Sequence, residues 1–246
     1  MLARRTQTNE PARCATLLPA LAQLPPPLAL IEVGASAGLT LLFDRYSYDF
    51  ARHQITGSDP LPRSCAASRS ARCPCRPGSP RSAGGPGWTS TRWMSAATMT
   101  SAGFPAWSGP VEGDREQRLA AAIAAARRDP PAVHRGDLRT DLPALAARAP
   151  VGATLVIYHS AVLAYLTPAD RRRVARTVRS LPAVWLSNEG PGVVPDQPIP
   201  PYQGTPFALA RDGGTPLALT DSHGMWLNWL SGPGRNLPEL HPTTSP

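Results

Sequence analysis

Residues 27–38 carry the clearest chemical pattern in this chain. An apolar run ends in an acidic residue, Glu32, and is followed by a loop of small residues, Gly34-Ala35-Ser36-Ala37-Gly38. This order is typical of a buried parallel strand that leads into a loop and helix able to hold a nucleotide-like ligand. The glycines let the loop backbone approach a cofactor closely. The pattern therefore predicts a cofactor site just beyond the first strand.

The same loop also matches G-x-S-x-G, the motif that places a serine hydrolase nucleophile on a sharp strand-to-helix turn. Ser36 would be the nucleophile, and Asp137 or Asp221 with His223 would complete a triad in the order Ser, Asp, His. Hydrolases of that fold place several strands before the nucleophile, whereas the residues before this strand are expected to be helical. A serine hydrolase is therefore an alternative, not the leading prediction.

Polar residues also stand at or just after the ends of three later predicted strands. Asp137 follows residues 132–136, His159-Ser160 ends residues 154–160, and Glu189 follows residues 183–188. Ligands of open α/β sheets bind at the carboxyl ends of the strands, so these side chains are candidates to face a substrate. His159 and Glu189 are predicted catalytic residues, with Glu189 as a proton acceptor. A structural histidine and an aspartate that caps the next turn remain open alternatives.

The elements that must position these residues alternate between helix and strand. Helices are expected at 11–24, from Leu39 to Phe43, and at 115–128, 141–149 and 167–181, with strands at 28–33, 132–138, 154–160, 183–186, 207–210, 217–220 and 225–230. This order predicts one α/β domain with a Rossmann-like, doubly wound sheet and an antiparallel C-terminal edge. Residues 1–26 form its helical lead-in and residues 231–246 a flexible tail.

The net charge of +8 is unevenly distributed. The segment 57–111 contributes +5 through six arginines and one aspartate, which leaves +3 for the rest of the chain. That is too little for a nucleic-acid surface, so a small-molecule ligand is expected instead. No membrane-length apolar run and no signal peptide are recognised, and a cytoplasmic location is expected.

The segment 57–111 differs from its flanks and is expected to be irregular or disordered. It is rich in Ser, Arg, Pro and Gly and holds Cys65, Cys73 and Cys75, whose spacing does not match a zinc site, so no metal is expected. Its codons also suggest a shifted reading frame. Trp and Met each have a single codon. The last base of that codon, read with the first two bases of the next codon, gives aspartate at Trp88-Thr89, Trp93-Met94 and Met99-Thr100. With GC-rich codons elsewhere, residues 87–95 become roughly LDLDPLDV, which is typical of a strand end.

Several motifs together resemble a bacterial family, domain of unknown function 2332, over roughly residues 5–56 and 112–230. They are Gln7-Thr8-Asn9-Glu10, the loop after Glu32, Asp44-Arg45-Tyr46, Arg135-Gly136-Asp137-Leu138, the run from Tyr158 to Leu166, and Ser187-Asn188-Glu189-Gly190. In that family, the region corresponding to residues 87–107 resembles a strand reading GLDLNPLD, close to the shifted frame.

The family in turn resembles Rossmann-like methyltransferases that use S-adenosylmethionine. This resemblance implies that Glu32 contacts the methionine end of the cofactor indirectly, and that Gly34, Ala35, Ser36 and Gly38 line the methionine and ribose pocket. Asp137 and Leu138 would hold the adenine. The acid expected to bind the ribose hydroxyls would lie in the altered segment, where the chain offers none, so an impaired enzyme is expected. A non-catalytic binding module on the same scaffold is the remaining alternative.

Overall fold

The structure is a computed structural model of the chain and describes residues 9–50, 54–57, 64–65, 67–68, 91–96 and 113–230. For residues 64–65, 67–68, 91–96 and 113–114 it describes the backbone alone. The expected tail at 231–246 and the cysteines Cys73 and Cys75 lie outside the described residues.

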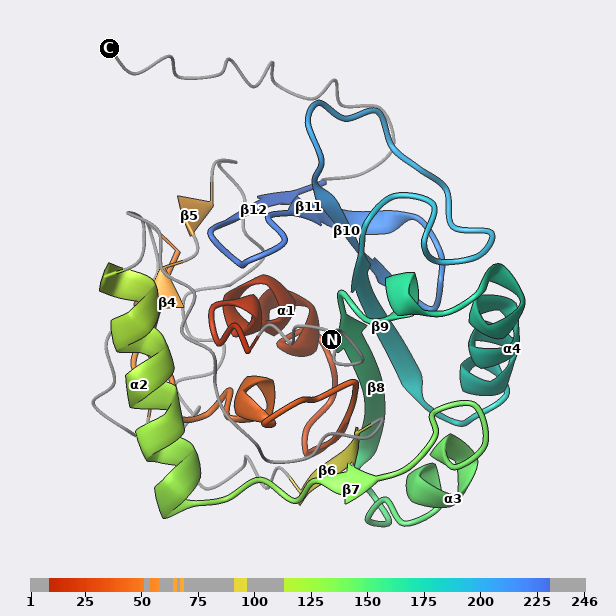
Figure 1. Cartoon of the computed structure of the whole chain (residues 1–246), viewed down its shortest axis with the longest axis horizontal. Helices are drawn as coiled ribbons and strands as arrows, with labels where there is room; N and C mark the ends of the chain where they lie inside the picture. Colours follow the sequence, from red (N-terminus) through yellow and green to blue (C-terminus); the bar gives the residue numbers. More distant parts are fainter. Residues whose placement is uncertain are drawn as a thin grey trace, which may run out of the picture.

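The fold is built on a nine-stranded mixed sheet (Figure 1). Five strands in the order β7-β6-β1-β8-β9 are parallel, β10, β11 and β12 continue the sheet antiparallel, and β5 pairs parallel with β12. The strands are β1 (Leu28–Val33), β5 (Ala67–Ser68), β6 (Thr91–Ala96), β7 (His134–Arg135), β8 (Thr154–Ser160), β9 (Val184–Glu189), β10 (Phe207–Arg211), β11 (Pro216–Thr220) and β12 (Trp226–Trp229). The α/β class and the antiparallel C-terminal strands agree with the prediction.

Helices cover both faces of this sheet. They are α1 (Arg13–Leu21), α2 (Gly113–Arg128), α3 (Leu142–Ala146) and α4 (Pro168–Arg179), with the short 3-10 helices η1 (Leu39–Leu41) and η2 (Leu163–Tyr165). In Figure 1 the sheet curves around α1, which has α2 beyond it, while α3 and α4 lie on the outer side. None of the described helices is long and apolar enough to cross a membrane.

The pleat of β1 assigns its residues alternately to two cores. Leu28 and Leu30 pack with α1 and the 39–50 segment, whereas Ala29, Ile31 and Val33 pack with α3 and α4. Side chains alternate between faces along a strand, so all six residues of β1 are buried. Helix α1 is buried along its whole length because the sheet, η1 and residues 42–50 surround it.

The 57–111 segment is more ordered than expected, because β4 (Ser64–Cys65), β5 and β6 all lie within it. Residues 91–96 form β6, which pairs in parallel with β1 on one side and with the edge strand β7 on the other. The expectation of an irregular segment is wrong there, because β-branched and aromatic residues in Thr91–Ala96 are compatible with a strand that is paired on both sides. A small second sheet joins β2 (Tyr48–Asp49), β3 (Gln54–Ile55) and β4.

The helix expected from Leu39 to Phe43 is reduced to the three residues of η1. Side-chain hydroxyl groups donate hydrogen bonds to backbone carbonyl groups that would accept backbone amides in an α-helix. The hydroxyl of Tyr46 donates to the Leu39 carbonyl at 2.7 Å, and that of Tyr48 to the Phe43 carbonyl at 2.9 Å. The Tyr158 hydroxyl donates to the Thr40 carbonyl at 3.1 Å. These tertiary bonds override the local helical pattern.

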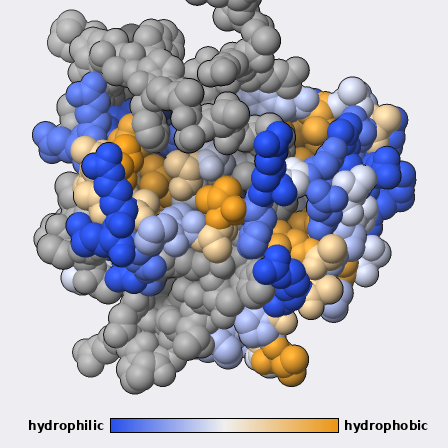
Figure 2. Space-filling view, turned by 60° about the horizontal axis from the view of Figure 1, so that its bottom comes forward, coloured by the Kyte–Doolittle hydropathy of each residue, from blue (hydrophilic) through white to orange (hydrophobic). Residues whose placement is uncertain are grey.

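The described surface mixes polar and apolar side chains. On the face drawn in Figure 2, hydrophobic groups are interspersed among hydrophilic ones. The large exposed hydrophobic residues are scattered along the chain at Val133, Val151, Tyr165, Ile199, Tyr202 and Met225. Scattered apolar residues of this kind are normal on a globular protein and indicate no particular partner.

Candidate functional site

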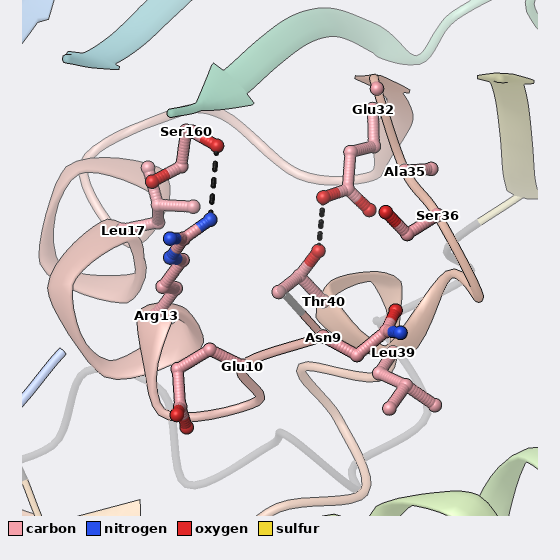
Figure 3. A pocket seen from close by; sticks show the side chains of 11 residues that line it. Asn9, Glu10, Arg13, Leu17, Glu32, Ala35, Ser36, Leu39, Thr40 and Ser160 are labelled. Carbon is pink, nitrogen blue, oxygen red and sulfur yellow. Dashed lines mark hydrogen bonds between the residues drawn. The ribbon is translucent and has the colours of Figure 1, made fainter. Parts of the chain in front are cut away.

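A pocket opens at the carboxyl end of β1, between that strand, β8 and the start of α1 (Figure 3). The pocket is small and partly open to solvent. Its walls are formed by Asn9, Glu10, Arg13, Leu17, Glu32, Gly34, Ala35, Ser36, Leu39, Thr40 and Ser160. Four of the residues predicted to bind a cofactor, Glu32, Gly34, Ala35 and Ser36, are therefore brought together in one cavity wall. Gly38 is the N-cap residue of η1 and is not among the residues that line the pocket.

Glu32 is the central acid of this pocket. Its side chain is almost completely buried, and its Oε1 accepts a hydrogen bond from the Thr40 hydroxyl. Its Oε2 is buried and has no hydrogen-bond partner among the described residues. Burial raises the pKa of Glu32 to about 7, although the Thr40 bond and the positive charge of Arg13 both act to lower the pKa. The carboxyl group can therefore gain or lose a proton near neutral pH.

The loop after β1 adopts the left-handed backbone that its glycines permit. Gly34 and Gly38 have φ values of +74°, and Ser36 has a φ of +51°. A Cβ atom added to Gly34 would lie 2.5 Å from Cγ2 of Val162, so this glycine lets the β1 and β8 loops approach. Asn9 accepts a hydrogen bond from the Ala37 amide at 3.1 Å, which fixes the N-terminal segment across the loop.

Glu32 is expected to make folding stability depend on pH. Its pKa is about 7 in the fold against an ordinary value of 4.5, so the native state holds the proton more tightly. This stabilisation is complete below pH 4.5 and is lost as pH rises through 7, a change of about 2.5 kcal/mol between pH 5 and pH 8. In urea unfolding, the free energy of unfolding of Glu32→Gln should not show this decrease between pH 5 and pH 8. The exposed Glu116→Gln variant on α2 should behave as the unaltered chain, and parallel pH profiles for all three proteins would contradict the assignment.

Six of the residues that line the pocket were not predicted as site residues: Asn9, Glu10, Arg13, Leu17, Leu39 and Thr40. Arg13 begins α1, where its Nε donates to the Ser222 carbonyl at 2.9 Å and its Nη1 to the Ser160 carbonyl at 3.1 Å. Glu10 pairs with Arg115 at 2.9 Å. Two features of the sequence could have indicated such residues. Arg13 is a single charge inside an apolar helical pattern, and Thr40 is a single polar residue within the run from Leu39 to Phe43.

The two predicted catalytic residues contact each other. The Nδ1 of His159 lies 2.7 Å from Oε1 of Glu189, and the indole N–H of Trp185 donates to Nε2 of the same imidazole at 2.9 Å. Because an indole N–H can only donate, the imidazole accepts at Nε2 and donates from Nδ1. The same Glu189 oxygen accepts from the amides of Val162 and Leu163 at 2.7 and 2.9 Å.

This pair lies on the opposite face of the sheet from Glu32. Trp185 belongs to the core formed with α3 and α4, whereas Tyr158, one residue before His159, belongs to the α1 side. His159 and Glu189 are each 1% exposed, and neither lines the pocket. Their observed bonds fix the loop that starts η2, and a catalytic role for them stays a prediction. Of the polar residues predicted at the ends of β8 and β9, Ser160 is the one that lines the pocket, because it lies on the same face of the sheet as Glu32.

Asp137 and Leu138 also lie away from the pocket walls. Asp137 pairs with Arg139 at 2.5 Å and accepts a hydrogen bond from the Arg139 amide at 2.9 Å. The hydrogen bonds from Arg139 lower the pKa of Asp137 to about 2. Leu138 is buried among the α3 and α4 residues. In this structure Asp137 caps a turn, the alternative considered above, and its role in adenine binding is untested.

The residues of the alternative hydrolase triad are not assembled around Ser36. Asp221 accepts from the amides of His223 and Met225 and so forms the turn between β11 and β12. His223 is exposed, and no histidine is among the residues that line the pocket. Among the described residues, no group of three metal-ligating side chains is placed to hold a metal ion.

Comparison with known proteins yields a family for the chain. Residues 1–81 and 107–229 match the family model described as "Uncharacterized protein conserved in bacteria (DUF2332)". The match includes residues 57–81 and 107–111, so the expectation that all of 57–111 departs from the family is wrong, and β6 lies in the unmatched part. No curated protein and no solved structure gives a significant match. Because the family model matches most of the chain, the chain belongs to the DUF2332 family.

Proposed function

We propose that this protein binds S-adenosylmethionine at the carboxyl end of β1 and is a methyltransferase-like protein. The observation that carries the proposal is the pocket itself. A buried carboxyl group, Glu32, presents an oxygen without a partner beside the small-residue loop Gly34-Ala35-Ser36. A buried polar atom without a partner is energetically costly, and a bound ligand that supplies a donor would remove that cost.

The position of the pocket in the sheet supports a nucleoside-containing ligand. Numbered along the chain, the five parallel strands β1, β6, β7, β8 and β9 lie in the order 3-2-1-4-5. In open α/β sheets of this order, ligands bind where the order reverses, outside the carboxyl ends of strands 1 and 4. Glu32 of β1 and Ser160 of β8 line the pocket from these two strands.

The short η1 favours a ligand without a pyrophosphate group. Dinucleotides place their phosphates at the N-terminus of a helix that follows the first strand, where the amides and the helix dipole stabilise negative charge. Here only the three residues Leu39–Leu41 are helical, which leaves no comparable dipole. S-adenosylmethionine carries no phosphate, and when bound it would supply an activated methyl group on its sulfonium.

The residues present fit the methionine end better than the ribose. Glu32 and Arg13 offer opposite charges to an amino-acid group, and residues 34–36 offer backbone at close range. The end of β6, Ser95-Ala96, has no carboxylate for the ribose hydroxyls. Losing such a charge-assisted contact costs about 2–4 kcal/mol, or roughly thirty- to a thousandfold in affinity, so weak binding is expected.

Calorimetric titration with S-adenosylmethionine and S-adenosylhomocysteine tests the proposal. We expect this chain to bind the two compounds weakly. A variant in which LDLDPLDV replaces residues 87–95 should bind them more tightly. Binding by the altered version alone would support an impaired enzyme. Binding by neither protein would contradict the proposal and favour a non-catalytic module on the same scaffold.

One observation keeps the hydrolase alternative open. Ser36 has the positive φ of +51° that is uncommon for a residue other than glycine and is found at strained functional turns. A fluorophosphonate probe that labels this chain but not a Ser36→Ala variant would favour a hydrolase. Absence of labelling is the expected result.

A further inference from the structure

Arg13 is a buried cation whose guanidinium faces the pocket. Its residue is 8% exposed, and two of its nitrogens are held by the carbonyls of Ser160 and Ser222. These two carbonyls belong to the end of β8 and to the β11–β12 turn, so the guanidinium is fixed in place. Its third nitrogen, Nη2, has no hydrogen-bond partner among the described residues.

The carboxylates around Arg13 do not form an ion pair with it. Burial lowers the pKa of Arg13, and the negative charges of Glu10, Glu189 and Glu32 oppose that shift from a distance. Glu10 is paired with Arg115, and Glu189 accepts hydrogen bonds on the other face of the sheet. Within the described part of the chain, no carboxylate oxygen lies within 4.0 Å of the Arg13 nitrogens. A buried guanidinium without a contacting anion is an unfavourable arrangement that an anionic ligand group would relieve.

The wall opposite Arg13 carries the complementary charge. Figure 3 shows Glu32 and Ser36 on one side of the pocket and Arg13 on the other. Glu32 is 7% exposed, and its unpartnered Oε2 belongs to the same cavity. The pocket therefore presents a buried acceptor, Oε2 of Glu32, and a cationic donor, Nη2 of Arg13, and neither atom has a hydrogen-bond partner among the described residues.

We propose that Arg13 binds the carboxylate of the ligand while Glu32 binds its cationic group, so that the pocket recognises an α-amino-acid end. This inference rests on the proposed function and names the residue that would select S-adenosylmethionine over nucleosides without an amino-acid group. The planar guanidinium suits a carboxylate because its parallel N–H groups match the two oxygens. Arg13 is the one residue of α1 that supplies a charge to this pocket.

A pair of ligands that differ only in the carboxylate tests this inference. In calorimetric titrations of the full chain, S-adenosylmethionine should bind roughly ten- to a hundredfold more tightly than decarboxylated S-adenosylmethionine. Arg13→Gln should remove most of that difference and leave the affinity for the decarboxylated compound within about threefold. Arg13→Lys should retain part of the difference because it keeps the charge. The exposed Arg172→Gln variant on α4 is the matched control and should bind both compounds as the unaltered chain does.

The outcomes separate the inference from the function on which it rests. Equal binding of the two compounds by the unaltered chain would overturn the role of Arg13 and leave the proposed function standing. An equal loss of affinity for both compounds in Arg13→Gln would show that the residue only anchors α1 through Ser160 and Ser222. If neither compound binds to the unaltered chain, the proposed function is overturned, and the inference with it.

Discussion

Replacement of Glu189 by alanine is expected to lower the free energy of unfolding by about 3–5 kcal/mol. One oxygen of this buried carboxylate accepts bonds from His159 and from the amides of Val162 and Leu163. Alanine would leave these donors buried without an acceptor. Chemical denaturation measures the change directly, because an altered midpoint with an unaltered slope reports stability.

Two comparisons define the result for Glu189. Glu189→Gln keeps an oxygen that can accept, so it should lose about 1–2 kcal/mol. Glu116→Ala, at an exposed position on α2, should change stability by less than about 0.5 kcal/mol. A Glu189→Ala protein as stable as the unaltered chain would contradict the structural role and would favour the catalytic role predicted from the sequence.

Gly34→Ala should be the most damaging glycine substitution near the pocket, with a loss of about 3 kcal/mol or more. Two effects combine at this position. The φ of +74° is unfavourable for any residue with a Cβ, and the new atom would lie 2.5 Å from Cγ2 of Val162. Valine is stiff about χ1, so the loop or β8 must move to make room. Thermal or urea unfolding measures the loss.

Gly152 provides the matched control for Gly34. It has a similar φ of +83°, but an added Cβ would have nothing within 4 Å. Gly152→Ala should therefore lose only about 1–2 kcal/mol, the conformational part of the effect. Val162→Ala should recover part of the loss when combined with Gly34→Ala. Equal losses of stability in Gly34→Ala and Gly152→Ala would show that contact with Val162 does not explain the need for glycine at position 34.

The strands of the sheet were predictable because their signals are local. β8 coincides with the predicted strand 154–160, and β1 with the predicted strand 28–33. The start of α4 was also predictable, because Thr167 accepts from the Asp170 amide and Pro168 takes the first helical position. The helix after β1 was not, because hydroxyls from Tyr46, Tyr48 and Tyr158 bind carbonyls that only the tertiary structure brings near them.

The candidate site was predictable on one strand and not across the sheet. Glu32 and the loop after it stand out because an acid and glycines follow an apolar run. Arg13 reaches them only because α1 packs inside the curved sheet, which no local pattern indicates. His159 and Glu189 contact each other, but strand pleating turns them to the face opposite Glu32.

Hydrogen exchange of backbone amides in the presence of S-adenosylhomocysteine tests the central claim most directly, because it reports where a ligand binds. At saturating ligand, the account predicts slower exchange in peptides that cover residues 33–40 and 9–14, the two sides of the pocket. Peptides from α4, residues 168–179, should exchange at the same rate as without ligand. Protection confined to segments away from the carboxyl end of β1, or no protection at all, would contradict the account.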